Sequence, residues 1–395
     1  MDSLRLPTVP PPAPATHPWR DRVLIALVAL LLPVMAWVDP LGGAAIKWEK
    51  RRASTWPPAA SLTSPATFGA AFSQAFADRF GMRSVFIVLQ HWALVDIFGV
   101  SPVSNVMIGR DGWLIWLGED GQSLDRHYRG VRVMPDIEAD SYVAEVKRRN
   151  EYLRARGIAY LTVIVPEKFT IYPEHLPEWV AQSPRPSLLA RTMDRLAKDG
   201  TVPFVDLGPL LREAKGTTGP EPLYYLTDTH WNLAGAGVGY MAIMRKVQEL
   251  LPGRMASIAP PVRPPYVSGQ DLYWGDLARV MGIPFRFNET DYLPLYKLKR
   301  DAGRLGLRAR LITPDRDSFK IYGQLDTTLP RLLMYRDSMA IALMPLIAEN
   351  FSRSVFVNAS TLVKAQVEAE HPDIVIDEIV ERGMVRISRN PTRPD

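Results

Sequence analysis

The sequence predicts an α/β fold in which a parallel β-sheet is covered by helices on both faces. Two observations lead to this prediction. Helical stretches alternate with short apolar strands from residue 137 to residue 251, and the alternation resumes at residue 331. Strands joined by helices form parallel sheets, and both faces of such sheets are buried. A hydrophobic content of 47% over 395 residues can fill the large core that this fold needs.

The individual elements follow from the spacing of apolar residues, which recur every three or four positions in helices and run continuously in short buried strands. Before residue 253 the pattern predicts a helix over 137–156, a strand over 160–165, a helix over 188–198, a strand over 202–206 and a helix over 233–251. After residue 330 it predicts a strand over 331–335, a helix over 340–351, a strand over 355–357, a helix over 362–370 and a strand over 373–376.

The N-terminal region has a different composition. Residues 1–22 form a tail rich in proline, and residues 23–38 are an uncharged apolar run that follows Arg20 and Arg22. This run is shorter than the ~20 residues of a typical membrane span and longer than a signal-peptide core of ~7–15 residues. We therefore expect a transmembrane anchor or a signal segment over 23–38, then a linker over 39–63. Whether the segment is cleaved stays open.

Residues 64–390 are predicted to form the main domain. It starts with a helix in which Phe68, Phe72 and Phe76 repeat every four residues, and a second helix covers 83–98. The stretch 106–116 has two apolar runs around an Asp-Gly pair, which is typical of a hairpin. Residues 253–330 are rich in Pro, Arg and Tyr without clear periodicity, so we interpret them as an excursion from the core with a few short strands.

Charge and cysteine content exclude several classes of function. The net charge is +5, but the basic residues are spread along the chain and form no patch interleaved with aromatic residues, so no nucleic-acid partner is expected. The chain has no cysteine, which excludes disulfides, a cysteine nucleophile and thiolate metal sites.

The strongest chemical signal is the stretch Tyr224-Tyr225-Leu226-Thr227-Asp228-Thr229-His230-Trp231-Asn232. In an extended segment, residues i and i+2 project to the same side, so Asp228 can lie beside His230. The carboxylate would then accept the Nδ1 proton and leave Nε2 as a base. A capping aspartate beside a core histidine is the alternative that the spacing leaves open. A metal site is not expected, because no third ligand stands out.

Ser338 is the candidate nucleophile for that base. It follows a predicted strand and precedes an apolar helix, a context that places a hydroxyl at the carboxyl edge of a sheet and near a helix N-terminus. A serine in this position can equally be a helix cap. Lys168 and Tyr172 after the strand that ends at Val165, and Asn358 after the strand that ends at Val357, occupy the edge where α/β sheets bind ligands, or are ordinary loop residues.

These residues, with several further motifs in the same order, resemble the periplasmic alginate O-acetyltransferase-type family, whose catalytic domain is of the SGNH-hydrolase kind. The resemblance covers about residues 64–385 and rests on seven stretches: Arg79-Phe80-Gly81-Met82-Arg83, Gly109-Arg110-Asp111-Gly112-Trp113-Leu114, Val165-Pro166-Glu167-Lys168 with Tyr172-Pro173-Glu174, Asp228-Thr229-His230-Trp231-Asn232, Gly275-Asp276-Leu277-Ala278, Asp337-Ser338, and Pro372-Asp373-Ile374-Val375-Ile376 leading to Glu381-Arg382.

The resemblance implies a three-layer α/β/α domain with a catalytic triad in which Asp228 orients, His230 is the base and Ser338 is the nucleophile. It implies a protein held at the inner membrane by a single pass, with its catalytic domain in the periplasm. Acetyl groups would come from a membrane-bound O-acyltransferase and pass to hydroxyls of an alginate-like or cellulose-like exopolysaccharide. No cofactor or metal is expected. A polysaccharide acetyl esterase and a non-catalytic glycan-binding subunit of an export complex remain alternatives.

The sequence departs from the family pattern beside the nucleophile. Arg336 stands where the family usually has glycine, and Met339 replaces the usual aromatic residue. Glycine there allows a tight turn and close backbone approach. We therefore expect Arg336 either to change the oxyanion geometry or to point outward and contact an anionic sugar.

Overall fold

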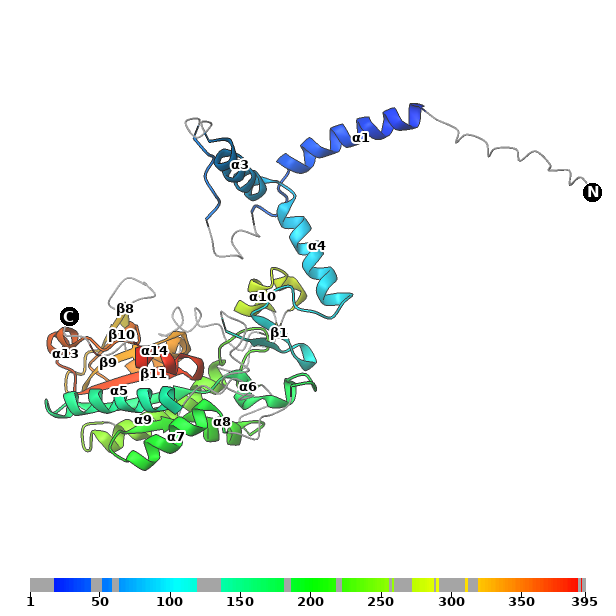
Figure 1. Cartoon of the computed structure of the whole chain (residues 1–395). Helices are drawn as coiled ribbons and strands as arrows, with labels where there is room; N and C mark the ends of the chain where they lie inside the picture. The colour runs from blue at the N-terminus through cyan, green and yellow to red at the C-terminus, as the bar shows by residue number, and fades with distance from the viewer. Residues whose placement is uncertain are drawn as a thin grey trace, which may run out of the picture. The chain divides into compact units, whose positions relative to one another are not determined.

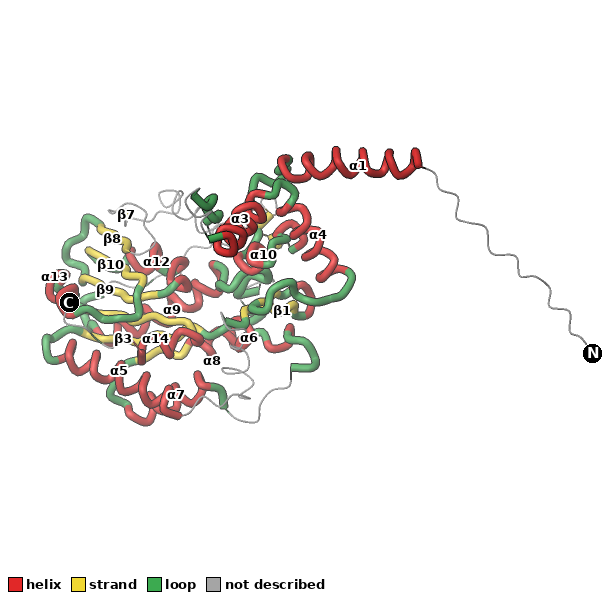
Figure 2. Tube along the Cα trace, turned by 45° about the horizontal axis from the view of Figure 1, so that its top comes forward, coloured by secondary structure: helices red, strands yellow, loops and turns green. Residues whose placement is uncertain are grey.

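The computed structural model describes residues 18–43, 52–58, 64–118, 136–180, 186–217, 222–255, 258, 272–287, 289–290, 310–311, 319–389 and 392 (Figures 1 and 2). The chain forms two compact units, Met1–Gln90 and His91–Asp395. The excursion predicted over 253–330 lies largely outside the described residues.

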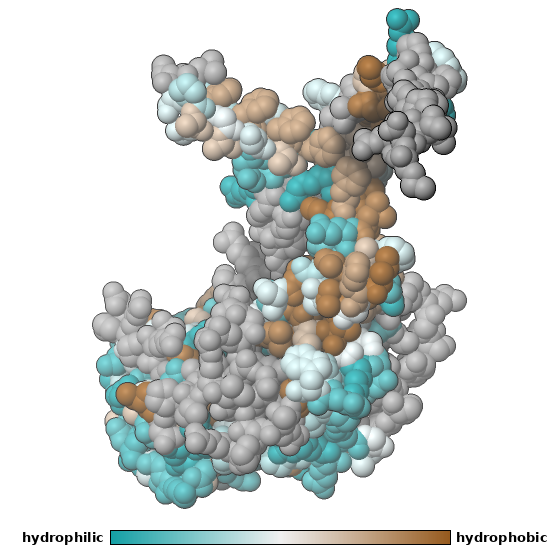
Figure 3. All heavy atoms as spheres, turned by 45° about the vertical axis from the view of Figure 1, so that its right-hand side comes forward, coloured by the Kyte–Doolittle hydropathy of each residue, from teal (hydrophilic) through white to brown (hydrophobic). Residues whose placement is uncertain are grey.

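The N-terminal unit is helical. It contains α1 (Pro18–Trp37), α3 (Pro65–Arg79) and the first part of α4 (Arg83–Asp96). The phenylalanine repeat predicted on α3 forms a row of rings, with centroids 5.9 Å apart between Phe68 and Phe72 and 6.3 Å apart between Phe72 and Phe76. Large apolar side chains are exposed along all three helices, and the space-filling view shows hydrophobic residues gathered there (Figure 3).

None of the helices in the described residues is both long enough and apolar enough to cross a membrane. The predicted segment 23–38 does form a helix, as part of α1, but the membrane span expected there is not supported.

The second unit is built on a seven-stranded sheet in the order β4-β3-β11-β9-β10-β8-β7. The strands are β3 (Ala159–Val165), β4 (Phe204–Asp206), β7 (Arg310–Leu311), β8 (Phe319–Gly323), β9 (Arg331–Arg336), β10 (Arg353–Asn358) and β11 (Ile374–Val380). The five strands from β4 to β10 run parallel, whereas β8 is antiparallel to β10 and β7 is antiparallel to β8. The prediction of a parallel sheet was therefore wrong at one edge, because β8 lies in the stretch that shows no clear periodicity.

Helices cover both faces, which makes the three layers that the resemblance implies. One core gathers side chains from α5 (Asp136–Arg154), α7 (Leu188–Asp199), α13 (Lys364–Glu370) and α14 (Met384–Arg389). The other gathers side chains from α8 (Leu207–Ala214), α9 (Leu233–Leu250) and α12 (Met344–Ala348). Figure 2 shows α5 and α7 side by side along the strands.

Most predicted elements are present within a few residues of their expected bounds. The helix predicted over 340–351 is instead a short 3₁₀ turn, η6 (Ser338–Ala342), followed by α12. The predicted hairpin forms from β1 (Val106–Ile108) and β2 (Leu114–Trp116), with Asp111 at a positive φ of 55° in the turn between them. Helix α8 was not predicted. Strand β8 lies where a few short strands were expected, but it joins the central sheet rather than an excursion from the core.

The order of the strands decides which loops meet. Strands β3, β11 and β9 are neighbours and run parallel, so their carboxyl ends lie at one edge of the sheet. The segments that follow them begin at Pro166, Glu381 and Asp337. Residues from three distant parts of the sequence are thereby brought to one edge, which is where open α/β sheets place their ligand sites.

Candidate active site

The two ends of the loop that carries Asp228 and His230 are hydrogen-bonded to each other just before helix α9. Tyr224 and Trp231 form an isolated antiparallel bridge, and Tyr225 N donates to His230 O at 3.2 Å. The Asn232 side chain then caps α9 by accepting from Ala234 N at 2.9 Å. Asparagine is a favoured N-cap, so the sequence ends the loop and starts the helix at the same residue.

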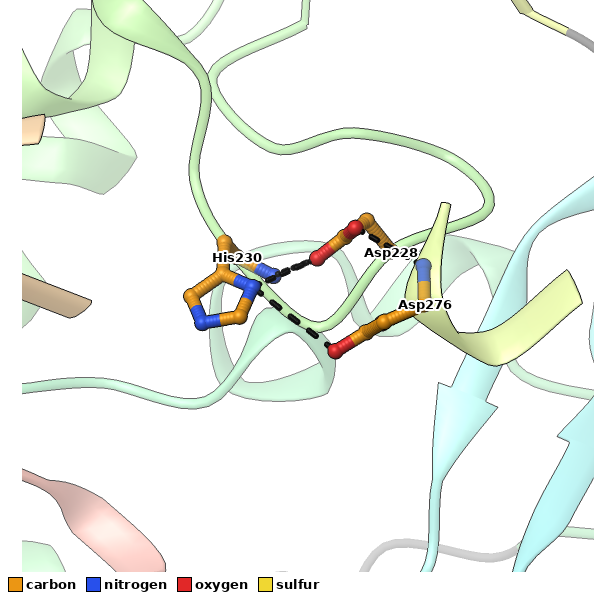
Figure 4. Close-up of side chains that lie close together, drawn as sticks. All are labelled: Asp228, His230 and Asp276. Carbon is orange, nitrogen blue, oxygen red and sulfur yellow. Dashed lines mark hydrogen bonds and ion pairs between the residues drawn. The ribbon is translucent and has the colours of Figure 1, made fainter. Parts of the chain in front are cut away.

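Within this loop His230 and Asp228 are hydrogen-bonded. The distance from His230 Nδ1 to Asp228 Oδ1 is 2.5 Å, and His230 N donates to the same oxygen at 3.0 Å. An ionised carboxylate can only accept, so Nδ1 carries the proton and Nε2 is left as the basic nitrogen. In Figure 4 Nδ1 faces the two carboxylates and Nε2 points away from them. Among the described residues none is hydrogen-bonded to Nε2, although this atom is buried.

Each residue of this pair shifts the pKa of the other, so that Asp228 favours the ionised form and His230 becomes more basic. Burial alone would raise the pKa of Asp228, but the charge and hydrogen bond of His230 outweigh it and hold that pKa below its usual value. Burial of the imidazole lowers the pKa of His230, whereas the charge and hydrogen bond of Asp228, with a smaller effect of Asp276, raise it; the net shift is upward. A base with a raised pKa is a stronger proton acceptor from a serine.

The other oxygen of Asp228 is held by a segment that the sequence analysis did not assign a role. Tyr273 OH donates to Asp228 Oδ2 at 2.6 Å, and Asp276 N donates to it at 2.8 Å. The Asp276 carboxylate in turn accepts from Thr229 N at 2.8 Å and from Thr229 Oγ1 at 2.7 Å. Its Oδ2 lies 3.8 Å from His230 Nδ1 (Figure 4). The start of α10 (Asp276–Val280) therefore holds the loop that carries Asp228 and His230.

Two further charged groups hold the main chain of the same loop. Glu289 accepts from Leu226 N at 2.6 Å and from Thr227 N at 2.8 Å. The Lys168 ammonium donates to the carbonyl oxygens of Tyr225 at 3.0 Å, Leu226 at 2.9 Å and Asp228 at 2.8 Å. Burial lowers the pKa of Lys168 to about 8, against the opposing effect of Glu289 and other nearby carboxylates. The three N–H groups of Lys168 are thus directed at the loop, at the position where a substrate contact was expected.

Ser338 lies where β9 ends, at the first residue of η6, and is partly exposed. The serine turn and the histidine loop are joined one residue further along, because Trp231 Nε1 donates to Met339 O at 2.9 Å. Ser338 precedes Met339 and His230 precedes Trp231, so the bond joins the residues that follow the candidate nucleophile and the candidate base. In the structure Ser338 Oγ is not hydrogen-bonded to His230 Nε2. Catalytic hydrogen bonds are often long in unliganded enzymes.

The other predicted contact residues occupy different surroundings. Tyr172 is buried, its OH accepts from Leu223 N at 2.8 Å, and its ring centroid lies 4.5 Å from that of Trp113. Asn358 is exposed at the end of β10, in register with Arg336 on β9. Arg336 is only 3% exposed, so the expectation that it points outward to an anionic sugar was wrong.

A carboxylate and a guanidinium are paired at the ends of β3 and β11. Arg382 Nη1 donates to both carboxylate oxygens of Glu167, at 2.8 and 2.9 Å. Glu381 Oε2 accepts from Glu167 N at 3.0 Å and from Thr170 Oγ1 at 2.7 Å, and its burial raises the pKa of Glu381 to about 8. The positive charge of Arg382 lowers the pKa of His230, so this group belongs to the electrostatic surroundings of the base.

One set of side chains among the described residues could offer three ligand atoms to a metal ion: Asp228, His230 and Asp276. The third ligand that the sequence did not reveal is therefore present. However, Nδ1 and Oδ1 are only 2.5 Å apart. Two tetrahedral zinc ligands with bonds of about 2.0 Å would lie about 3.3 Å apart. The geometry is that of a hydrogen-bonded acid and imidazole.

Sequence reasoning missed the residues that hold the loop. Asp276 was noticed only as part of a motif, without a role. The same is true of Arg382, which is bonded to Glu167 and acts on the charge of His230 rather than on the loop. Tyr273 and Glu289 lie in the stretch without periodicity, where no spacing predicts that they reach residues 226–228. A chemical requirement could have indicated such residues, because buried N–H groups of a loop need acceptors. Glu289 supplies an acceptor, and Tyr273 holds the acceptor Asp228 in place.

Comparison with known proteins finds a matching family model and two relatives. The family model described as "SGNH hydrolase-like domain, acetyltransferase AlgX" matches residues 106–298, a range that includes Asp228 and His230 and ends before Ser338. The chain is 30% identical over 163 residues to the probable alginate O-acetylase AlgJ of Pseudomonas fluorescens, covering 41% of this chain and 38% of that protein. It is 30% identical over 150 residues to AlgJ of Pseudomonas aeruginosa, covering 37% and 34%. The matches thus span little more than a third of these relatives.

The fold is also similar to a solved structure. Bacillus cereus PatB1, determined with a sulfonyl adduct, superposes with a TM-score of 0.51, covering 71% of this chain and 94% of that one. The sequences are only 13% identical. This similarity therefore concerns the fold.

Proposed function

Because this chain belongs to the alginate O-acetyltransferase-type family with an SGNH hydrolase-like domain, we propose that it transfers acetyl groups to hydroxyls of an exopolysaccharide through an acyl-enzyme on Ser338. One observation carries the proposal. His230 is hydrogen-bonded through Nδ1 to the buried Asp228, which leaves Nε2 as a base. The Trp231–Met339 bond, which links this loop to the turn that contains Ser338, supports Ser338 as its partner.

The proposed chemistry has two steps. In the first, Ser338 Oγ attacks the carbonyl carbon of an acetyl donor while His230 Nε2 takes the hydroxyl proton; the bond to the donor's leaving group breaks, and His230 returns the proton to it. In the second, a sugar hydroxyl attacks the acetyl-serine and loses its proton to His230. The ester bond to Ser338 breaks, and Oγ recovers a proton from the imidazolium. Asp228 keeps the imidazole in the required tautomer throughout.

The remaining predicted residues take different roles in this proposal. Lys168 acts as a positioning residue for the loop, because its ammonium is bonded to three loop carbonyls. Tyr172 supports the packing under the loop. Asn358 is the predicted contact that stays exposed, so we retain it as a candidate for binding the acceptor.

The acceptor and the location of the reaction rest on the resemblance. The relatives are named as probable alginate O-acetylases, which favours an alginate-like polymer over a cellulose-like one. We place the reaction in the periplasm, with a membrane-bound O-acyltransferase as acetyl donor and with residues 23–38 as the segment that directs the chain there.

The nucleophile can be tested without knowing the natural donor. Phenylmethylsulfonyl fluoride, a small serine-directed probe, should label the wild-type protein once, with the added mass mapped to Ser338. Ser338→Ala should remain unlabelled, and His230→Ala should be labelled at least about a hundredfold more slowly. The matched control is Ser352→Ala, at another partly exposed serine. A folded wild-type protein that is not labelled at Ser338 would exclude the acyl-enzyme and favour the glycan-binding alternative.

A further inference from the structure

Arg336 is a buried charged residue that the proposed chemistry does not use directly. It is the last residue of β9, two positions before Ser338, and is 3% exposed. Burial of a guanidinium is costly unless the group is hydrogen-bonded and its charge is compensated. Its surroundings therefore indicate what it does.

The main chain at Arg336 is paired with only one of the two strands that flank β9. The ladder between β9 and β11 ends at Tyr335 and Asp377. Beyond this point side chains hold the turn: Asp337 N donates to Glu378 Oε2 at 3.1 Å, and Asp337 Oδ2 accepts from Val380 N at 2.8 Å. The turn that leads to Ser338 is thus fixed by side chains where ladder bonds are missing.

Arg336 supplies the contact to the carbonyl of this turn. Its Nη1 donates to Asp337 O at 3.2 Å. That oxygen belongs to the peptide between Asp337 and Ser338. In a planar trans peptide the C=O and N–H groups point in opposite directions. Because the carbonyl faces Arg336, the N–H of Ser338 points away from it, and rotation of this peptide would move both the N–H and the Cα of the nucleophile.

The charge of Arg336 also acts on Glu378. Burial and the charge of Asp337 raise the pKa of Glu378 well above its usual value, and Arg336 opposes that rise. The other oxygen of Asp337, Oδ1, accepts from Met339 N at 2.8 Å. The three residues form one buried group around the peptide.

We propose that Arg336 is a positioning residue for the nucleophile: its guanidinium holds the Asp337 carbonyl and thereby sets the orientation of the peptide that carries Ser338. This inference rests on the proposed function, in which Ser338 is the nucleophile. Arg336 is buried and acts through the main chain, so it affects the rate of the chemical step and leaves substrate binding unchanged. An interaction needed only in the transition state lowers kcat without raising KM.

The test compares Arg336→Gln and Arg336→Lys with the wild-type protein in the rate of labelling by phenylmethylsulfonyl fluoride. In this reaction Ser338 Oγ bonds to the sulfur, the S–F bond breaks, fluoride leaves, and the hydroxyl proton passes to His230. Arg331→Gln is the matched control, because Arg331 begins the same strand and its guanidinium also donates to a main-chain carbonyl, that of Glu370, at 2.6 Å. Thermal unfolding of each variant shows that the protein assayed is folded.

We expect Arg336→Gln to be labelled about ten- to a hundredfold more slowly, because misplacement of a reacting group by about 1 Å has effects of this size. Arg336→Lys keeps a charged donor and should recover part of the rate, and Arg331→Gln should react like the wild type. With p-nitrophenyl acetate, kcat should fall in Arg336→Gln and KM should not change.

The outcomes separate the inference from the function on which it rests. Labelling of the wild type and of both Arg336 variants at equal rates would overturn the positioning role and leave the proposed function standing. If Arg336→Gln does not fold, Arg336→Lys alone decides: a folded Lys variant with the wild-type rate contradicts the role. A folded wild type without label at Ser338 would overturn the proposed function, and the inference with it.

Discussion

At the scale of single residues, the site is governed by two carboxylates on one side of an imidazole. Asp228 bonds directly to His230 Nδ1, and Asp276 lies 3.8 Å from the same nitrogen while it holds Thr229. Both negative charges favour the protonated imidazole, which is the form that the proposed mechanism requires after proton transfer from Ser338. Asp276 therefore combines two roles, because it orders the loop and adds to the stabilisation of the imidazolium.

The charge of Asp276 can be removed without changing its shape. His230 acts as a base only when Nε2 is unprotonated, so the rate of Ser338 labelling should rise with pH through the pKa of His230, which lies above its usual value. Asp276 raises that pKa, so in Asp276→Asn the rise should move to lower pH. The measurement is the labelling rate between pH 5 and pH 9, with Asp194→Asn as a control at an exposed aspartate on α7. A lower rate with an unchanged midpoint would mean that Asp276 acts only by ordering the loop.

At the scale of elements, the position of α10 depends on how closely the residues just before it approach the loop that carries Asp228 and His230. Gly275 N donates to Thr227 Oγ1 at 3.0 Å, and Ala278 N donates to Thr227 O at 3.3 Å. A Cβ on Gly275 would overlap the Thr227 carbonyl and the Asp228 main chain. The glycine is required here by space, since its φ of −62° is open to any residue.

Gly275→Ala should therefore separate α10 from the loop. We expect a loss of stability of roughly 2–4 kcal/mol, the size usual for strong local overpacking and broken buried hydrogen bonds, and labelling of Ser338 slower by at least about tenfold. Urea unfolding and the labelling rate measure the two effects. Gly69→Ala is the control, because a Cβ on Gly69 in α3 meets nothing within 4 Å. Wild-type stability in Gly275→Ala would show that the loop adapts without the close approach.

The elements also show how far the sequence could be read. Apolar periodicity predicted β3, β9, β10, β11 and the long helices, because these elements bury one face or a whole strand and their pattern records it. The two-residue spacing of Asp228 and His230 predicted their hydrogen bond, which the structure contains. The strand β8, with Lys320 buried in its middle, has no pattern that distinguishes it from a loop.

Contacts between distant segments could not be predicted from the sequence, for a physical reason. The functions of Lys168, Glu289 and Tyr273 depend on which loop groups face them, and this is set by strand order and loop path rather than by local spacing. Lys168 was predicted at the correct edge of the sheet with a substrate as its partner, and in the structure its partners are loop carbonyls. The burial of Arg336 follows from its place on a central strand, between β11 and β10, which local spacing does not reveal.

At the scale of the whole molecule, all residues of the candidate site belong to the unit His91–Asp395. The side chains that the structure describes as bonded to Asp228 and to Thr229 come from this unit. A protein comprising residues 64–395 should therefore keep α3 and α4 and be labelled by phenylmethylsulfonyl fluoride at the wild-type rate, whereas the full chain should sediment with membranes if residues 23–38 direct it there. Labelling of purified protein and fractionation of producing cells are the two measurements.

Ser338→Ala in the shortened protein controls for labelling elsewhere, and deletion of residues 39–63 alone controls for the change in length. A folded 64–395 protein that fails to react would mean that the N-terminal unit takes part in forming the site, and equal sedimentation of the two proteins would exclude residues 23–38 as the targeting segment.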